Sequence, residues 1–271
     1  SQEEICDAIK LAKDVLYVHE QGGFPLHNWI SNCEEVRRAI GTTSSEQQKN
    51  LNLEPTVTTQ KVLGMWWDAQ LDVFCFEIPP RNEDLLLGTT IPTKRQILSM
   101  LMSLYDPLRK KGGQELVLKV TLQETWRMNV GWDDEVPQYI YEMWSQWVAH
   151  IPTLQSISIP RCYRESVTIT ECKIQLHVFV DAGKDGYTAV AYFRFETNDH
   201  VEVALIGGKT RVAPLKFISV PRLELQAAVL GLRLAKSICE SHREKVQQQF
   251  FWTDSRDVVC LMLITGVIVP L

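Results

Sequence analysis

The sequence predicts an α+β protein, with helices and a hairpin in its first half and a mixed sheet with helices in its second half. Apolar residues recur at helical spacing in several segments before residue 150. Apolar and polar residues alternate over residues 173–181, as in a half-buried strand. After residue 160 the pattern becomes strand, hairpin, strand, helix and strand, so we place a domain boundary there and expect domains over residues 1–160 and 161–271.

The first half begins with a predicted helix over residues 1–20, which Gly22 and Gly23 end. Two β-like segments, residues 61–67 and 71–78, predict a hairpin. Further helices are expected at about residues 93–104, 116–127 and 137–150. Tyr141, Trp144 and Trp147 lie three or four residues apart in the last of these helices, a spacing typical of a buried face.

The second half contains three predicted strands, one long helix and one short strand. The strands are expected over residues 173–181, 188–195 and 201–209, the helix over 221–239 and the short buried strand over 250–254.

Composition and charge restrict the possible classes of protein. Of the 271 residues, 45% are hydrophobic and 23% charged, as in a globular protein rather than a disordered one. The net charge of −5 argues mildly against a general nucleic-acid binder, although a local basic groove can lie on an acidic body. No basic-then-apolar leader opens the chain, and no apolar run reaches the ~20 residues that span a bilayer. We therefore expect a protein that is not secreted and has no membrane partner.

Three acidic residues lie where a carboxylate is costly. The sequence predicts Asp181 at the end of an apolar strand, Glu224 in the first turn of a mostly apolar helix, and Asp254 at the end of a second apolar strand. Carboxylates at such places are desolvated and need a compensating cation. If the three converge, they form an oxygen-only site suited to Mg²⁺. Two such ions about 4 Å apart can drive in-line cleavage of a phosphodiester.

Each acid also has a purely structural interpretation, and these alternatives stay open at this point. Asp181 precedes Ala182-Gly183 and is a possible turn former. Glu224 near a helix start would favour the helix dipole. Asp254-Ser255 would cap a helix beginning at Arg256. Their joint order along the chain, strand-Asp, helix-Glu and strand-Asp-Ser, favours a shared site.

Three motifs resemble the acidic motifs of the ribonuclease H family, namely Val178-Phe179-Val180-Asp181-Ala182, Glu224-Leu225-Gln226-Ala227-Ala228 and Trp252-Thr253-Asp254-Ser255. The chain is similar to BEL/Pao retrotransposons, in the region often labelled the Pao retrotransposon peptidase family, in the segment Val220-Pro221-Arg222-Leu223-Glu224-Leu225-Gln226-Ala227-Ala228 followed by Phe251-Trp252-Thr253-Asp254-Ser255. In the first half, residues 22–32, Leu63-Gly64-Met65-Trp66-Trp67 and residues 93–99 with Tyr105-Asp106-Pro107-Leu108 resemble the end of a reverse transcriptase.

The resemblance implies a truncated piece of a retrotransposon polyprotein, with a palm–thumb remnant and connection-like region over residues 1–160 and a ribonuclease-H-like domain, incomplete at its C-terminus, over 161–271. It implies that Asp181, Glu224 and Asp254 are catalytic metal ligands for two Mg²⁺ or Mn²⁺ ions, with no small-molecule cofactor. The implied partners are an RNA–DNA hybrid or other nucleic acid and the remainder of the Pol polyprotein, in the cytoplasm or in intracellular retroelement particles.

The sequence also departs from the family pattern. The polymerase motif is not among these residues, and the fourth acid expected of a ribonuclease H is not reached. No Asp-Thr-Gly or Asp-Ser-Gly triplet of an aspartic protease occurs. We therefore expect a nuclease that is weak or inactive alone. The competing interpretation is a non-catalytic nucleic-acid-binding or interaction relic of a retroelement.

Overall fold

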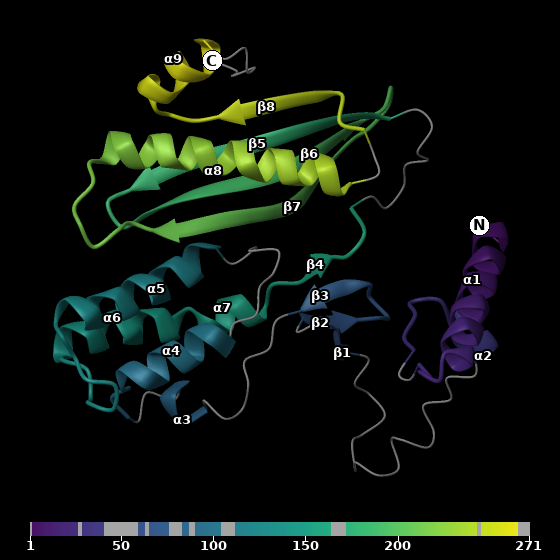
Figure 1. Ribbon diagram of the computed structural model, residues 1–271, viewed down its shortest axis with the longest axis horizontal. Helices are drawn as coiled ribbons and strands as arrows, with labels where there is room; N and C mark the ends of the chain where they lie inside the picture. Colours follow the sequence, from purple (N-terminus) through teal and green to yellow (C-terminus); the bar gives the residue numbers. More distant parts are fainter. Residues whose placement is uncertain are drawn as a thin grey trace. The chain divides into compact units, whose positions relative to one another are not determined.

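The computed structural model describes residues 2–26, 29–40, 59–62, 65–75, 83–86, 90–103, 112–163, 172–242 and 245–264. The chain forms two compact units, whose elements are labelled in Figure 1. The first unit comprises Ser1–Phe76 and Ser158–Arg161, and the second comprises Glu77–Ile157 and Cys162–Leu271. Helices and sheets occur together, which confirms the predicted α+β class. No helix in the described part of the chain is both long and apolar enough to span a membrane.

The helices of the first unit are α1 (Gln2–Gln21) and α2 (Glu34–Ile40). The predicted first helix is confirmed, while Ser1 of its capping pair lies outside the described residues. Gly23 ends α1 with a positive φ of 74°, a backbone conformation that favours glycine. The amide of Phe24 then donates to the carbonyl of His19 at 2.9 Å, which satisfies one of the last carbonyls of the helix.

The sheet of the first unit has the order β1-β2-β3-β4, with all neighbours antiparallel. Its strands are β1 (Thr59–Val62), β2 (Met65–Asp68), β3 (Val73–Cys75) and β4 (Ile159–Pro160). The predicted hairpin between residues 61–67 and 71–78 is confirmed as β2 and β3 in the described residues, while residues 76–78 of the prediction lie outside them. The prediction of one continuous strand over residues 61–67 was wrong, because Val62 pairs with Met65 in a hairpin of its own.

One ion pair joins two of these short strands. Asp72, just before β3, accepts two hydrogen bonds from the guanidinium of Arg161 at 2.6 and 2.9 Å, and one from the indole of Trp67 at 3.0 Å. Burial raises the pKa of the Asp72 carboxyl, but the hydrogen bonds and positive charge of Arg161, with the bond from Trp67, lower it by more in total. This cluster therefore ties the start of β3 to the residue that follows β4.

The part of the second unit before its sheet has, in the residues that the structure describes, five helices: α3 (Glu83–Leu86), α4 (Lys94–Ser103), α5 (Gly112–Arg127), α6 (Gln138–Ala149) and α7 (Ile151–Gln155). Thr93 caps α4 reciprocally with Gln96, since each side chain bonds to the other residue's amide, at 3.3 and 2.8 Å. Trp144 and Trp147 are 1% and 0% exposed, which confirms their predicted packing role. They belong to an apolar cluster with Ile97, Met100, Leu118 and Ile140.

The sheet of the second unit has the order β7-β6-β5-β8. Its strands are β5 (Lys173–Gly183), β6 (Gly186–Glu196), β7 (Val201–Val212) and β8 (Gln248–Trp252). The first three are antiparallel neighbours, and β8 runs parallel to β5. Two helices complete it, α8 (Val220–Ser241) and α9 (Arg256–Ile264). This confirms the predicted mixed sheet and its long helix.

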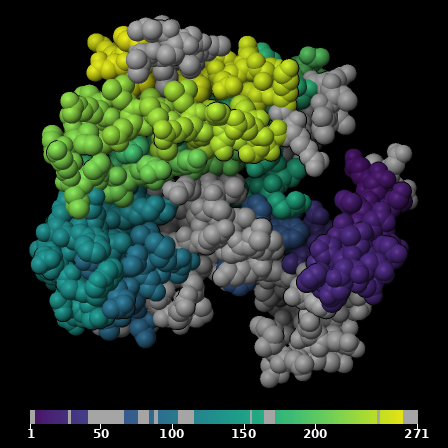
Figure 2. Space-filling model, viewed as in Figure 1, coloured from purple at the N-terminus to yellow at the C-terminus, as the bar shows by residue number. Residues whose placement is uncertain are grey.

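Helix α8 packs on one face of this sheet (Figure 1), and its outer side forms a continuous part of the unit's surface in Figure 2. Gly231 allows the close approach, because a Cβ at this position would lie 2.5 Å from Cγ1 of Val180. The core between helix and sheet is apolar and includes Leu176, Val178, Ala189 and Leu234. This face of β5 is thus closed to solvent.

Candidate active site

Asp181 lies on β5 opposite Thr188 of β6. Val178 and Val180 face α8, so alternation along the strand places Asp181 on the other face of the sheet. Its side chain is exposed, and its Oδ1 accepts a hydrogen bond from the amide of Ala182 at 2.7 Å. The prediction that Asp181 ends its strand was wrong, since β5 continues to Gly183, and the expected desolvation of its carboxylate is not observed.

Glu224 lies on α8 and is half-buried. The helix begins at Val220 with Pro221 in its first turn, so the prediction of Glu224 in that turn was wrong. Because the field of the helix dipole falls off within the first turn, it is a poor explanation for this carboxylate. Oε2 of Glu224 instead accepts a hydrogen bond from the hydroxyl of Ser255 at 2.5 Å.

Asp254 lies two residues beyond β8, whose last residue is Trp252 rather than Asp254 as predicted. Its side chain is exposed, again in contrast to the expected desolvation. The buried Ser255 that follows caps α9, because its Oγ accepts from the amide of Val258 at 3.4 Å. Ser255 alone provides this cap, so capping does not account for the Asp254 carboxylate.

The pairing of strands brings the backbones of the two aspartates to one edge of the sheet. Phe179 of β5 is in register with Trp252 of the parallel strand β8, and each aspartate follows two residues later. The Ser255–Glu224 hydrogen bond joins the start of α9 to α8 at the same edge. Thus Glu224 is tied to the segment that carries Asp254, and Asp181 is on the neighbouring strand. We call Asp181, Glu224 and Asp254 the acidic trio.

The acidic trio agrees in ligand type with a hard divalent cation, because all three side chains offer carboxylate oxygens. In the described residues, however, no group of three His, Cys, Asp or Glu side chains is close enough together to hold a metal ion. In the present conformation Asp181 bonds to its neighbouring amide and Glu224 to a serine hydroxyl. The topology therefore fits a metal site, while the side chains are not gathered into one.

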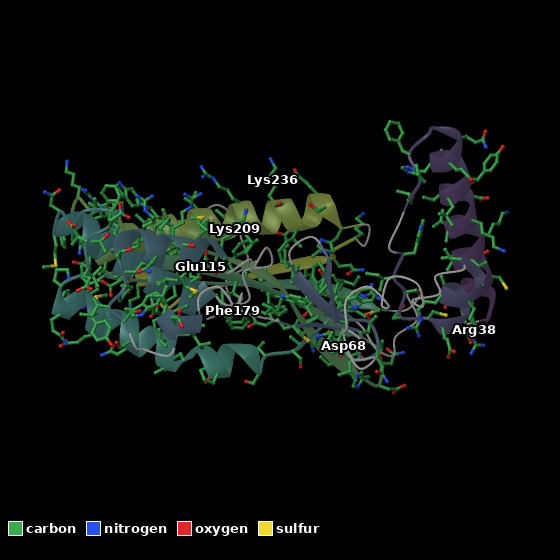
Figure 3. All side chains as sticks on the ribbon, turned by 90° about the horizontal axis from the view of Figure 1, so that it is seen from below. Arg38, Asp68, Glu115, Phe179, Lys209 and Lys236 are labelled. Carbon is green, nitrogen blue, oxygen red and sulfur yellow. The ribbon has the colours of Figure 1, made fainter. Side chains whose placement is uncertain are left out.

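An aromatic strip leads along the open face of the sheet toward the two aspartates. It consists of His177, Phe179, Phe250 and Trp252. The rings of Phe179 and Trp252 stack with centroids 5.6 Å apart, and those of His177 and Phe250 with centroids 4.8 Å apart. Phe179, labelled in Figure 3, is 43% exposed. Sequence reasoning assigned no function to these residues; the alternation of Phe179 with Val178 and Val180 is the signal that places it on the open face.

The surroundings of His177 in this strip favour its neutral form. The indole Nε1 of Trp252 donates to its Nδ1 at 3.1 Å, and its Nε2 lies 3.3 Å from Oε1 of Gln175. A ring that accepts at Nδ1 and donates at Nε2 carries one proton. Burial, together with the positive charge of Arg194, lowers the pKa of His177 below its usual range. Both observations favour the uncharged imidazole.

Comparisons with known proteins identify the family of the chain. The family described as "Pao retrotransposon-like RNaseH-like domain" matches residues 93–255, more than half of the chain. A search of curated proteins finds no match. The chain is also similar to a solved foamy viral protease-reverse transcriptase in complex with RNA/DNA hybrid, with a TM-score of 0.41 and 13% identity, covering 77% of this chain and 26% of that one. It thus spans about a quarter of that protein's length. On the family match, the chain belongs to the Pao retrotransposon-like ribonuclease-H-like domain family.

Proposed function

We propose that the chain is a fragment of a retrotransposon Pol polyprotein whose parent enzyme reverse-transcribes RNA and hydrolyses the RNA strand of RNA–DNA hybrids. Family membership supports the retrotransposon origin. In this proposal residues 1–160 derive from the end of the palm, the thumb and a connection-like region, and residues 161–271 form the ribonuclease-H-like domain. The observation that carries the nuclease assignment is the Ser255–Glu224 hydrogen bond, because it links two of the three acidic motifs in space.

Asp181, Glu224 and Asp254 would hold two Mg²⁺ or Mn²⁺ ions, which when bound supply an activated water and stabilisation of the leaving oxygen. Ser255 acts as a positioning residue, since its hydroxyl fixes one oxygen of the Glu224 carboxylate. The Asp181 carboxylate has to turn away from the Ala182 amide before it can act as a ligand. Because the trio is not gathered beforehand, we expect the isolated chain to be a weak nuclease.

The experiment that tests this proposal is hydrolysis of a labelled RNA–DNA hybrid during titration with Mg²⁺ or Mn²⁺. We expect slow, metal-dependent cleavage of the RNA strand, reduced by at least about 100-fold in Asp181→Asn, because a neutral amide is a poor ligand for a hard cation. Asp185→Asn is the matched control, since Asp185 is an exposed aspartate in the turn after β5 and outside the trio. Equal cleavage by Asp181→Asn and Asp185→Asn would contradict the assignment.

The second candidate function is a relic that binds nucleic acid without cleaving it. The absence of a gathered three-ligand group among the described residues favours this alternative. It predicts hybrid binding that is indifferent to divalent metal, with no cleavage by the unmodified chain at any metal concentration. The same titration therefore separates the two candidates.

A further inference from the structure

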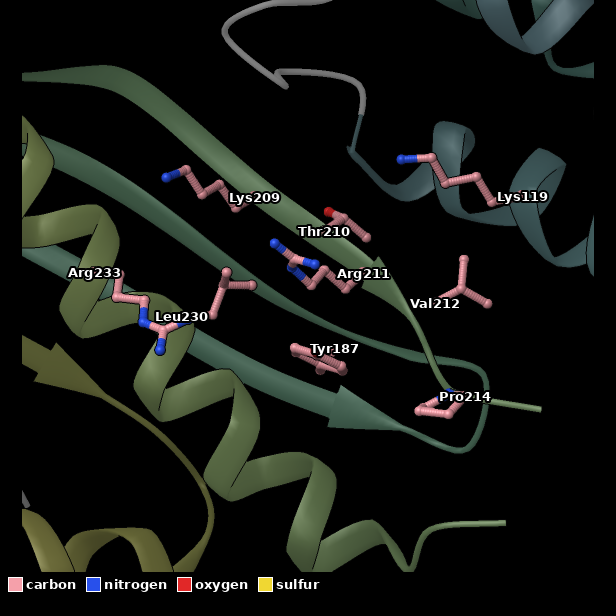
Figure 4. Close-up of a pocket in the computed structure, with 9 residues that line it drawn as sticks. All are labelled: Lys119, Tyr187, Lys209, Thr210, Arg211, Val212, Pro214, Leu230 and Arg233. Carbon is pink, nitrogen blue, oxygen red and sulfur yellow. The ribbon is translucent and has the colours of Figure 1, made fainter. Parts of the chain in front are cut away.

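A pocket of about 590 Å³ lies along β7, one of the two edge strands in the described sheet of the second unit (Figure 4). Lys209 and Arg211 of β7 pair with Ala189 and Tyr187 of β6, and buried Ala189 lies on the side of the sheet that faces α8. The pocket is therefore on the α8 side of the sheet. Its lining comes from α5, β6, β7, α8 and the residue Pro214 that follows β7, as Lys119, Tyr187, Lys209, Thr210, Arg211, Val212, Pro214, Leu230 and Arg233.

The charges of this lining all have one sign. Four cationic side chains, Lys119 on α5, Lys209 and Arg211 on β7, and Arg233 on α8, line it, and no lining residue is acidic. We call these four residues the basic pocket. Lys119 pairs with Glu115 at 2.5 Å, whereas the other three form no ion pair with a described residue. Like charges held around one cavity repel each other, so an anion in the cavity would lower their mutual repulsion.

The basic pocket lies on a chain whose net charge is −5. An evenly acidic body would repel a polyanion at every point, while a local cationic cavity focuses the attraction at one place. Two of the four cations are arginines, whose planar forks suit bidentate contact with phosphate oxygens. The charge and the donor geometry therefore favour phosphate as the ligand.

The pocket and the acidic trio are on different sides of the sheet and of α8. Asp181 pairs with Thr188, and Thr188 pairs in turn with Thr210 of the pocket wall, so the backbones of Asp181 and Thr210 are two strand spacings, or roughly 10 Å, apart. The Asp181 side chain, however, points to the open face, whereas the pocket is on the α8 side. Along α8, Arg233 follows Glu224 by nine residues, or about two and a half turns, which places their side chains on opposite sides of the helix. The basic pocket is therefore a site separate from the acidic trio.

We propose that the basic pocket binds backbone phosphates of a nucleic acid, at a site separate from the acidic trio. The proposal rests on the proposed function for the identity of the polyanion. It assigns these residues to affinity and register, because phosphate contacts position a nucleic acid without selecting its sequence.

The test is the binding of a fluorescent RNA–DNA hybrid to the full chain, in EDTA, followed by anisotropy between about 50 and 200 mM salt. The pocket variant is Lys209→Ala/Arg211→Ala/Arg233→Ala. The control, Lys173→Ala/Lys236→Ala/Lys245→Ala, removes the same charge from exposed sites outside the pocket; Lys236 and Lys209 are labelled in Figure 3. Circular dichroism checks that both variants keep the fold.

The slope of log K against log salt should be smaller in magnitude by about three for the pocket variant, which is about one for each lost phosphate contact. For the control variant the slope should change by less than about one. The affinity of the pocket variant should fall on the order of tenfold or more at the lower salt concentration. Competing inorganic phosphate, up to millimolar concentration, should displace little hybrid, because one phosphate cannot replace several contacts.

Three results would overturn the inference: equal slopes and affinities for the two variants, no hybrid binding by the unmodified chain, or displacement by phosphate or polyglutamate as effective as by unlabelled hybrid. Cleavage is measured separately with added metal. Hybrid binding that depends on the pocket, without metal-dependent cleavage, supports the inference and rejects the nuclease assignment. Metal-dependent cleavage by a pocket variant whose affinity is unchanged supports the nuclease assignment and rejects the inference.

Discussion

The two faces of the β7-β6-β5-β8 sheet differ in what their side chains do. On β5, Leu176, Val178 and Val180 point into the core under α8, and each is at most 4% exposed. The intervening Phe179 and Asp181 point to the open face, where both are exposed. One strand thus contributes to stability with one face and to the candidate active site with the other. The open face can present the Asp181 carboxylate to solvent because the covered face supplies the burial that stabilises the strand.

The largest expected effect is on the covered face. Leu176→Ala should lower the free energy of unfolding by about 2 to 5 kcal/mol, because Leu176 is fully buried and its loss leaves a cavity. Phe179→Ala, on the same strand but the open face, should cost only about 1 kcal/mol, since its ring is 43% exposed and loses mainly its stacking on Trp252. Urea unfolding of both variants measures the difference. Equal losses in the free energy of unfolding would contradict the distinction between the two faces.

The next effect concerns the distance between α8 and the sheet. Gly231→Ala should destabilise the protein by about 1 to 2 kcal/mol, because the new methyl would meet Cγ1 of Val180 at 2.5 Å. Overpacking then outweighs the roughly 1 kcal/mol that alanine gains over glycine in a helix. Gly183→Ala is the matched control, since a Cβ added to Gly183 would meet nothing within 4 Å. A thermal unfolding midpoint for Gly231→Ala at or above that of the unmodified chain would contradict this close packing.

Hydrophobic periodicity predicted the strands and the long helix of the second unit well, because burial of one face leaves a regular pattern within each element. Residues 173–181 alternate because one face of β5 packs on α8, so burial is visible in the sequence. The split of residues 61–67 into β1 and β2 was not predictable in this way, because both strands are short and carry no regular alternation. Where an element ends also depends on pairing: β5 extends past Asp181 because β6 continues beside it.

The residues of the candidate site were predicted from their order along the chain, but their surroundings were not. The contact between Ser255 and Glu224 joins segments 31 residues apart and depends on how α8 and α9 pack. The basic pocket is less predictable still, because Lys119, Lys209, Arg211 and Arg233 come from three elements and form no motif in the sequence. Burial was predicted wrongly for Asp181 and Asp254, since Asp181 points to an uncovered face of the sheet and Asp254 lies beyond the end of β8.

The smallest effect concerns pH and His177 on the open face. Its pKa in the folded protein lies below the ordinary value of about 6.5, so its contribution to stability is complete above that value. The contribution is lost as the pH falls from there toward the folded pKa, because protonation breaks the hydrogen bond from Trp252. His177→Phe keeps a ring and cannot titrate. The unfolding midpoint of His177→Phe should therefore fall less than that of the unmodified chain between about pH 7.5 and 5.5. Equal falls in the two proteins would show that His177 does not cause the pH dependence of stability.

The most direct test of the proposed metal site is binding of Mn²⁺ to the full chain, measured by electron paramagnetic resonance of the free ion. We predict saturable binding that Asp181→Asn, Glu224→Gln and Asp254→Asn each weaken by at least about tenfold, while Asp185→Asn leaves it unchanged. Binding that is absent from the unmodified chain, or equally strong in all four variants, would contradict the claim that the acidic trio forms one metal site.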